Sequence, residues 1–388
     1  MRVLKKFFQH VDYYLLIAVF LLCGIGLVMI YSASIGVSIT KYEYSPSHFF
    51  VRQLAFFFVG LIIFAFTLVL PYQTYKKLMV PIVFGSIAML AAVFLFGKTV
   101  NNAKSWIMIG GFGLQPAEFV KLGLAIYLAG IFSKKQEKLD QFSTSVIPPL
   151  SIIVIILLLI IKQPDFGTAM IVASVAGIVI FCSGMRRKHL FLLIGSCLAA
   201  LSLFSFLFSG EQMSRFDAAY DPFSDPEQDG YQLINAYVAM AAGGLTGSGL
   251  GESVQKYGFL PEPHTDFIIA IIGEELGFLG IAVVLLLLAF IVLKGFYIGV
   301  IGKDTYGSLL AFGISGMIGV QSVVNLGAAV GVLPITGVPL PFVSYGGSSL
   351  ILFMASAGIL INISAHVHYK QNQPVSAPAV RESHVKAL

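Results

Sequence analysis

Long apolar stretches dominate the sequence and constrain its fold more than any other feature. A helix needs about 20 mostly apolar residues to cross a bilayer, and about ten stretches fit that template. They cover residues 13–34, 50–70, 78–96, 116–132, 146–161, 166–182, 190–209, 267–293, 308–330 and 348–365. Only 11% of the 388 residues are charged, whereas soluble domains average about 25%. The sequence therefore predicts an all-α polytopic integral membrane protein with about ten transmembrane helices.

The basic residues predict the orientation of the chain in the membrane. Arg2, Lys5 and Lys6 precede a first stretch that is too long for a signal peptide and lacks a cleavage site, so we expect it to be retained as a span. An even number of crossings then places both termini in the cytoplasm, with most of the 24 Lys and Arg residues on that side. The net charge of +5 thus reflects orientation, and no nucleic-acid partner is expected because the basic residues form only short clusters.

The connection between the seventh and eighth stretches, residues 210–266, is much longer than the others. Nine of its residues are Asp or Glu, against Arg215 and Lys256, so we expect a large acidic extracytoplasmic loop. Loops of this length are usually functional or disordered. Residues 231–242 within it are apolar enough to form an amphipathic helix on the membrane surface.

A second irregular segment, residues 331–349, contains Pro334, Pro339 and Pro341 and cannot form a regular helix. Non-helical backbone at membrane depth persists only against protein or a water-filled cavity, so we expect this segment to line a cavity. Residues 1–368 are predicted to form one membrane catalytic domain. The polar residues 369–388 are predicted to form a disordered cytoplasmic tail.

Ionisable residues inside or beside the apolar stretches are costly and are therefore candidate site residues. Glu118 and Lys121 are three positions apart and share one face of a helix, where they form either a structural ion pair or part of a site. Lys162 and Asp165 flank Pro164 at the outer end of the fifth stretch. For these two, a snorkelling lysine and a helix-capping aspartate are the simpler interpretation.

Asp266 ends the acidic loop and directly precedes an apolar stretch. Its carboxylate is therefore expected at the outer membrane boundary, partly desolvated yet accessible from outside. Partial burial raises the pKa of a carboxyl group towards that of a useful general base. The alternative is a helix N-cap, a role for which Thr265 and Asp266 are both suitable. Glu274 and Glu275 lie deeper and are expected to serve helix packing or a partner contact.

Other chemical patterns are weaker. Glu262, His264 and Asp266 carry groups that bind divalent cations such as Mg²⁺ or Mn²⁺, but so short a cluster does not specify a metal. The three cysteines lie in apolar stretches without the spacing of a metal site or a disulfide framework. Ser344 has no nucleophile-elbow context, so a Ser-His-Asp triad is not predicted.

Several motifs together resemble the SEDS family, the shape, elongation, division and sporulation proteins of bacteria. The most specific is NLGAAVGVLPITGVPLPFVSYGGSS at residues 325–349. It is joined by VRQ at 51–53, QPAEFVK at 115–121, QPDFGTAM at 163–170, GGLTGSGLGESVQKYGFLPEPHTDF at 243–267 and EELG at 274–277. The resemblance covers nearly the whole chain apart from the tail. GLGESVQKYGFLPE is most similar to the division-type members of Gram-positive rods.

This resemblance implies a peptidoglycan glycosyltransferase that polymerises lipid II at the outer face of the cytoplasmic membrane, at the division septum, and releases undecaprenyl pyrophosphate. The essential loop aspartate of the family corresponds to Asp266, as general base, and its membrane Glu and Lys correspond to Glu118 and Lys121. The expected substrate-binding residues are Arg52, Lys104, Asp165, Arg215, Glu262, His264 and Ser344. A class B penicillin-binding protein, a transpeptidase, and other divisome membrane proteins are the implied partners.

Two positions depart from the pattern of the family. Ala117 replaces the usual serine of QPSE, and Lys104-Ser105-Trp106 replaces the usual Arg-Trp after the third stretch. The second departure leaves open which cation binds the pyrophosphate.

Two other functions also remain open. Broken helices and intramembrane charges suit a lipid II flippase, and a non-catalytic scaffold of the division machinery is a third interpretation. The external position expected for Asp266 favours chemistry on a substrate that has already crossed the membrane.

Overall fold

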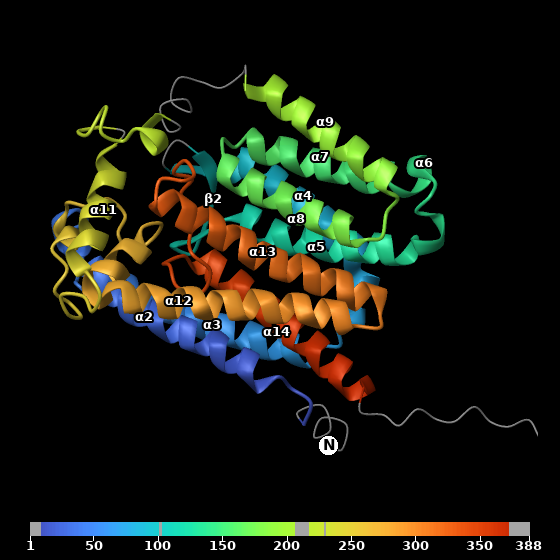
Figure 1. Ribbon diagram of the computed structural model, residues 1–388, viewed down its shortest axis with the longest axis horizontal. Coiled ribbons are helices and arrows are strands. Elements are labelled where there is room, and N and C mark those ends of the chain that lie inside the picture. The colour runs from blue at the N-terminus through green and yellow to red at the C-terminus, as the bar shows by residue number, and fades with distance from the viewer. Residues whose placement is uncertain (1–8, 101–102, 206–216, 229, 372–388) are drawn as a thin grey trace, which may run out of the picture.

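The computed structural model describes residues 9–100, 103–205, 217–228 and 230–371, and most of its regular structure is helical (Figure 1). The α-helices are α2 (Tyr13–Thr40), α3 (His48–Val69), α4 (Gln73–Phe96), α5 (Pro116–Lys134), α6 (Phe142–Ser145), α7 (Ile147–Ile161), α8 (Phe166–Cys182), α9 (Arg187–Ser205), α11 (Tyr231–Gly243), α12 (Ile268–Ile301), α13 (Thr305–Ala329) and α14 (Gly347–Gln371). Two 3₁₀ turns, η1 (Gln136–Lys138) and η2 (Gln255–Tyr257), complete the helical elements.

Seven of the described helices, α2, α3, α4, α5, α12, α13 and α14, are long and apolar enough to cross a membrane. The apolar helices α7 and α8 are shorter, and α9 overlaps the seventh predicted stretch. The predicted all-α polytopic membrane fold is thus confirmed, whereas the count of ten spans stays a prediction. Only 22% of the apolar window of α3 and 28% of that of α4 are buried, whereas 78%, 72% and 83% are buried in α5, α13 and α14.

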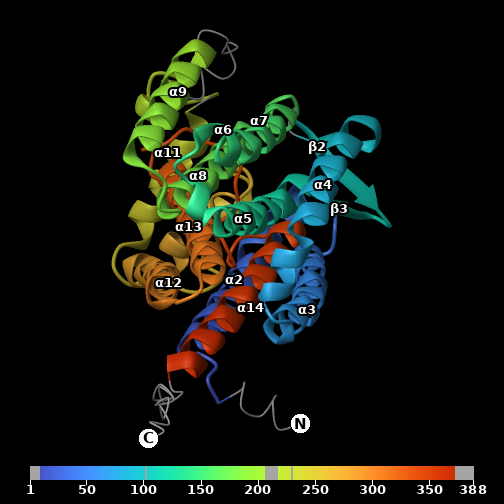
Figure 2. The ribbon, with the colours of Figure 1, turned by 90° about the vertical axis from the view of Figure 1, so that its right-hand side faces the viewer.

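The buried helices form the centre of the bundle. The helix α13 packs against α5, α8 and α12, and α14 packs against α3 and α5. Figures 1 and 2 show these helices running alongside one another, with α11 across one end of the bundle. The segment predicted to be an amphipathic helix, 231–242, is confirmed as α11, which packs against α12. Its place on the membrane surface stays a prediction.

The start of α2 and the end of α14 lie at the same end of the bundle, because the rings of His10 and Tyr369 meet edge to face with centroids 5.4 Å apart. An ion pair of 3.0 Å between Asp12 and Lys294 brings the far part of α12 to that end too. An even number of crossings between the two ends follows. The helix α14 continues to Gln371, past the predicted start of the tail at residue 369. The disordered tail stays a prediction, because residues 372–388 lie outside the described residues.

A small antiparallel sheet between α4 and α5 was not predicted. Its strands are β1 (Lys98–Val100), β2 (Ala103–Ile109) and β3 (Phe112–Leu114), in that order. Gly110 and Gly111, with φ of +56° and +83°, close the β2–β3 hairpin, and positive φ at both central residues is what a two-residue hairpin turn requires. The Gly-Gly pair between apolar residues was the sequence signal for this turn.

The helix α12 is broken at Gly277, whose φ of +66° and ψ of −166° are not helical. The acidic loop supplies the backbone partners at the break. Phe278 and Leu279 donate their amides to the carbonyls of Gly244 and Leu245, at 2.9 and 3.2 Å. In return, Ser248 and Gly249 donate to the carbonyls of Glu274 and Glu275, at 2.9 and 3.0 Å. Hydropathy predicted an unbroken stretch here, because it does not report such a break.

Candidate active site

The irregular segment between α13 and α14, predicted from its prolines, is confirmed and lies at the centre of the candidate site. Helices on several sides and the acidic loop bind its backbone. The side-chain amides of Gln321, Asn325 and Gln53 donate to the backbone carbonyls of Pro339 (2.9 Å), Val338 (2.8 Å) and Ser344 (3.4 Å), respectively. The backbone amide of Tyr345 donates to the carbonyl of His264 (2.9 Å). The segment thereby holds the loop residues next to α13.

Asp266 lines a pocket between the start of α12, the end of α13 and the irregular segment. The other polar lining residues are Asn325 and Thr336, and the remainder are Phe267, Ala328, Ala329, Ile335, Gly337 and Val338. Asn325 donates to the backbone carbonyl of Asp266 at 2.8 Å and so fixes that residue against α13. The N-cap of α12 is Phe267, without a side-chain capping bond. The alternative that Asp266 or Thr265 caps this helix is therefore wrong.

The surroundings of Asp266 suit a general base. Burial, together with the negative charge of Glu262, raises the pKa of Asp266 to about 6. Such a carboxylate is ionised at neutral pH and is a stronger base than one in water. Glu262 itself pairs with Lys41 at 3.2 Å. His264 is only 2% exposed, and burial lowers its pKa to about 4, so it is neutral at neutral pH and supplies no positive charge.

Two buried oxygens beside Asp266 have no hydrogen-bond partner, Oδ1 of Asn325 and Oγ1 of Thr336. Asn325 is 2% exposed and uses its amide protons on backbone carbonyls, which leaves Oδ1 as an acceptor. None of the residues that line this pocket is a cation. Asn325 and Thr336 were not predicted as site residues from the sequence; the signal for Asn325 was a polar residue within an apolar helix.

Arg52 and Lys104 lie by the small sheet. The guanidinium of Arg52 donates to the carbonyl of Gly111 and lies over the ring of Phe112, 5.4 Å from its centroid. The ammonium of Lys104 donates to the carbonyl of Phe94 at 2.7 Å. Both predicted phosphate-binding cations are thus held by backbone carbonyls outside the pocket of Asp266. Their role in binding substrate stays a prediction.

Glu118 and Lys121 form a buried ion pair at the start of α5. Their side chains are 3% and 0% exposed, and the ammonium of Lys121 lies 2.7 Å from Glu118 Oε1 and 2.6 Å from Gln321 Oε1. This geometry agrees with the structural ion pair that the sequence left open. It joins α5 to α13, and it leaves Lys121 without an exposed surface for a phosphate.

Asp165 is the N-cap of α8, as its simpler interpretation predicted, and accepts from the amide of Thr168 at 3.0 Å. It also accepts from the side chain of Gln115 at 3.0 Å. The hydroxyl of Ser344 is buried and accepts from the amide of Leu340 at 2.9 Å, which closes a turn. Arg215 lies outside the described residues.

In the described part of the chain, no three His, Cys, Asp or Glu side chains converge. Glu262, His264 and Asp266 therefore do not make a ligand set. We assign no step of the mechanism to a metal ion, and the Mg²⁺ or Mn²⁺ considered from the sequence stays a prediction.

The fold and the site define a multi-pass membrane protein whose candidate base, Asp266, lies at the end of the bundle opposite the start of α2 and the end of α14. Residues 13–369 match the family model described as "Cell cycle protein", and the chain belongs to this family, the SEDS proteins. The resemblance stated from the motifs is thereby confirmed.

Relatives of known name cover almost the whole chain. It is 46% identical to the probable peptidoglycan glycosyltransferase FtsW of Bacillus subtilis (strain 168), over 97% of this chain and 96% of that protein. It is 39% identical to stage V sporulation protein E of the same organism, over 92% and 98%.

Solved structures also match. One, described as "Structural coordination of polymerization and crosslinking by a peptidoglycan synthase complex", has a TM-score of 0.75 at 27% identity, over 94% of this chain and 99% of that chain. The rod shape determining protein RodA of Thermus thermophilus has a TM-score of 0.67 at 27% identity, over 94% and 98%.

Proposed function

We propose that this chain is a peptidoglycan glycosyltransferase that polymerises lipid II at the outer face of the cytoplasmic membrane during septal wall synthesis. The observation that carries the proposal is Asp266, a carboxylate with a pKa of about 6 that lines a pocket at the end of the bundle. The names of two relatives, both probable peptidoglycan glycosyltransferases, support the activity.

The reaction joins two lipid-linked sugars. Asp266 takes the proton from the 4-hydroxyl of the acceptor GlcNAc as that oxygen attacks the anomeric carbon of the donor. The bond between this carbon and the pyrophosphate oxygen breaks, and undecaprenyl pyrophosphate leaves with the electron pair. A single displacement inverts an α-linked donor to a β-linked product without a covalent enzyme intermediate. General-base assistance of this kind contributes about 10²–10⁴-fold to the rate.

The two substrates need different surroundings, and the site offers both. Beside Asp266, the buried acceptor oxygens of Asn325 and Thr336 have no hydrogen-bond partner, and no cation lines the pocket. We therefore assign the neutral acceptor sugar to this side of the site. The leaving pyrophosphate needs positive charge. Arg52 and Lys104 are the cations that we assign to it, in preference to the enclosed Lys121.

The partner that we propose is a class B penicillin-binding protein, which would cross-link the new strands, together with other divisome membrane proteins. The support is the similarity to the chain from a structure described as a peptidoglycan synthase complex. We further propose that both termini face the cytoplasm and that the protein acts at the septum.

The test is polymerisation of lipid II in detergent by the purified chain, with and without its cognate partner, with glycan products separated by length. Wild-type protein is expected to form glycan strands, and Asp266→Asn is expected to abolish them while the protein still folds and binds lipid II. Asp221→Asn makes the same chemical change at an exposed position of the same loop and is the matched control. Activity retained in Asp266→Asn would remove this residue from its role. Transport of lipid II across vesicles without polymer would favour the flippase instead.

A further inference from the structure

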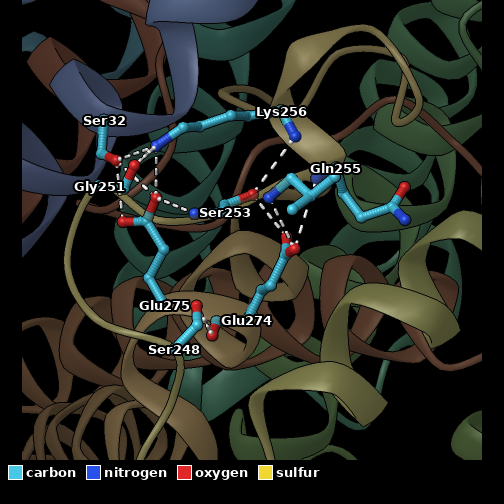
Figure 3. Close-up of polar contacts among 9 residues, drawn as sticks. Ser32, Ser248, Gly251, Ser253, Gln255, Lys256, Glu274 and Glu275 are labelled. Atoms are coloured by element: carbon cyan, nitrogen blue, oxygen red, sulfur yellow. Dashed lines mark hydrogen bonds and ion pairs between the residues drawn. The ribbon is translucent and has the colours of Figure 1, made fainter.

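A cluster of buried polar side chains joins the acidic loop to α2 and α12 (Figure 3). Lys256 of the loop is 1% exposed and donates to Glu275 of α12 at 2.8 Å and to the hydroxyl of Ser32 of α2 at 3.1 Å. Ser32 donates in turn to the carboxylate of Glu275, 2.6 Å from its nearer oxygen. We call Ser32, Lys256 and Glu275 the anchoring cluster. Each charge in it has an opposite charge or a hydroxyl as its partner.

The neighbouring carboxylate, Glu274, binds the same turn of the loop. It accepts from the hydroxyl of Ser253 at 2.5 Å and from the amide of Val254 at 2.8 Å (Figure 3). Both carboxylates stand just before the break in α12 at Gly277, where the loop also completes the backbone hydrogen bonds of the helix. The break and the two glutamates together form the part of α12 that binds the loop.

The energetics of the anchoring cluster point to alignment rather than to net stability. Burial of a charged side chain costs several kcal/mol per ion, and replacement of a buried ion pair by uncharged groups of similar volume is often neutral or stabilising. The best-attested role of such a pair is to fix the register of the segments that it joins. A shift of the loop by one residue would leave the charges of Lys256 and Glu275 buried and unpaired.

The register of this loop bears directly on the proposed base. Asp266 lies ten residues after Lys256 and eight residues before Glu274. Both ends of the stretch 257–273 are thus fixed next to each other, by Lys256 at one end and Glu274 at the other, which limits the conformations open to the stretch. Gly258, with φ of +108°, lies near the start of this stretch, directly after the turn η2.

We propose that the anchoring cluster positions Asp266: Lys256 and Glu275 hold the loop in the one register that places the carboxylate of Asp266 in its pocket. They are positioning residues and do not touch substrate. The proposal rests on the proposed function of Asp266 as the base. From the sequence, Glu275 was expected to serve helix packing or a partner contact, and no role was predicted for Lys256.

The experiment compares wild type, Lys256→Met and the double variant Lys256→Met/Glu275→Gln, each as full-length chain with its partner, in lipid II polymerisation and in thermal unfolding. Lys256→Met leaves a buried unpaired carboxylate, so we expect a lower Tm and less folded protein. The double variant removes both charges and is expected to regain the Tm of wild type. Its kcat per folded protein is expected to stay about tenfold or more below wild type, with KM for lipid II within about twofold, because positioning of the base acts in the transition state.

The matched control is Lys294→Met. Lys294 pairs with Asp12 and joins the same two helices, α12 and α2, at the opposite end. We expect this variant to lose Tm but to keep the kcat of wild type per folded protein. If the double variant does not fold, Ser32→Ala keeps the ion pair and is expected to lower kcat several-fold at unchanged Tm.

Two results would overturn the proposal. The first is a double variant with the kcat of wild type, or Ser32→Ala with that kcat if the double variant does not fold. The second is an equal loss of kcat in the tested variant and in Lys294→Met, which would show a structural role alone. A wild-type chain that forms no polymer would overturn the proposed function itself, and this inference with it.

Discussion

The pKa of Asp266 sets an expected pH dependence. Burial and the negative charge of Glu262 raise this pKa to about 6. A general base works only when ionised, so kcat/KM is expected to fall about tenfold per pH unit as the pH drops below about 6. Glu262→Gln removes one of the two causes, so the acid limb of the profile should move to lower pH.

The other charged and titratable groups near Asp266 do not oppose this shift. Lys41 loses its partner in Glu262→Gln, and its positive charge also lowers the pKa of a nearby carboxyl group. His264 is neutral above about pH 4. The measurement is a pH–rate profile of polymerisation by wild type and Glu262→Gln. An acid limb at the same pH in both proteins would contradict this account of the pKa.

The buried pair of Glu118 and Lys121 predicts a loss of stability when one partner is removed. Lys121→Met would leave the carboxylate of Glu118 uncompensated inside the bundle, at a cost of about 3–5 kcal/mol. The double variant Glu118→Gln/Lys121→Met should recover most of that loss. Thermal unfolding in detergent, followed by size-exclusion chromatography, measures both. A stable but inactive Lys121→Met would instead assign Lys121 to the reaction, as the family resemblance implied.

Residue types, spacing and the resemblance to the SEDS family predicted ionisable residues for the site but not their contacts. Asp266 was predicted from its place between an acidic loop and an apolar stretch, and the structure places it beside a pocket. Asn325 and Lys256 were missed because their importance depends on partners far away in sequence, the carbonyl of Asp266 and the carboxylate of Glu275. Such pairings are set by the packing of helices, which one sequence does not display.

At the scale of elements, the break in α12 predicts a strong requirement for glycine at residue 277. A Cβ there would lie 2.4 Å from the amide nitrogen of Gly247 and 2.5 Å from the carbonyl carbon of Leu245, and φ of +66° with ψ of −166° is essentially a glycine-only conformation. Gly277→Ala should therefore destabilise the protein by about 1–3 kcal/mol or more and detach the loop from α12, with loss of polymerisation.

A helical glycine in open space is the control for Gly277→Ala. In α8, a Cβ at Gly177 would meet no atom within 4 Å, so Gly177→Ala should be neutral or stabilising by up to about 1 kcal/mol. Tm and lipid II polymerisation of the two variants give the comparison. Equal Tm and activity in both would show that the bend at Gly277 is not required.

Hydropathy predicted where the long helices lie but not what interrupts or connects them. Each predicted stretch overlaps one helix, because a helix that crosses a bilayer needs a continuous run of apolar residues, and such a run is visible in the sequence. The small sheet and the break at Gly277 escaped prediction for a common reason. Each depends on a few residues that barely change the mean hydropathy. The only sequence signals were glycines, Gly110 and Gly111 for the sheet and Gly277 for the break.

For the whole molecule, the lateral arrangement of helices brings together residues that the sequence separates widely. Gln321 of α13 bonds Lys121 of α5, and Gln53 of α3 bonds the irregular segment before α14. The sequence predicts a number and a direction for the spans, but it does not predict which spans are neighbours. In lipid, side-chain packing and a few polar contacts decide that choice.

The topology gives the last prediction, and it tests the orientation on which the proposed reaction depends. The ends of α2 and α14 lie together, and Asp266 lies at the other end of the bundle. If the basic loops face the cytoplasm, a cysteine at exposed Leu250 in the acidic loop should react with a membrane-impermeant maleimide in intact protoplasts.

A cysteine at exposed Lys303, between α12 and α13, should react only after lysis. Wild type, whose described cysteines Cys23 and Cys182 lie in apolar helices, gives the background. The reverse pattern would place Asp266 in the cytoplasm, away from the substrate, and would exclude it as the base of an extracytoplasmic polymerase.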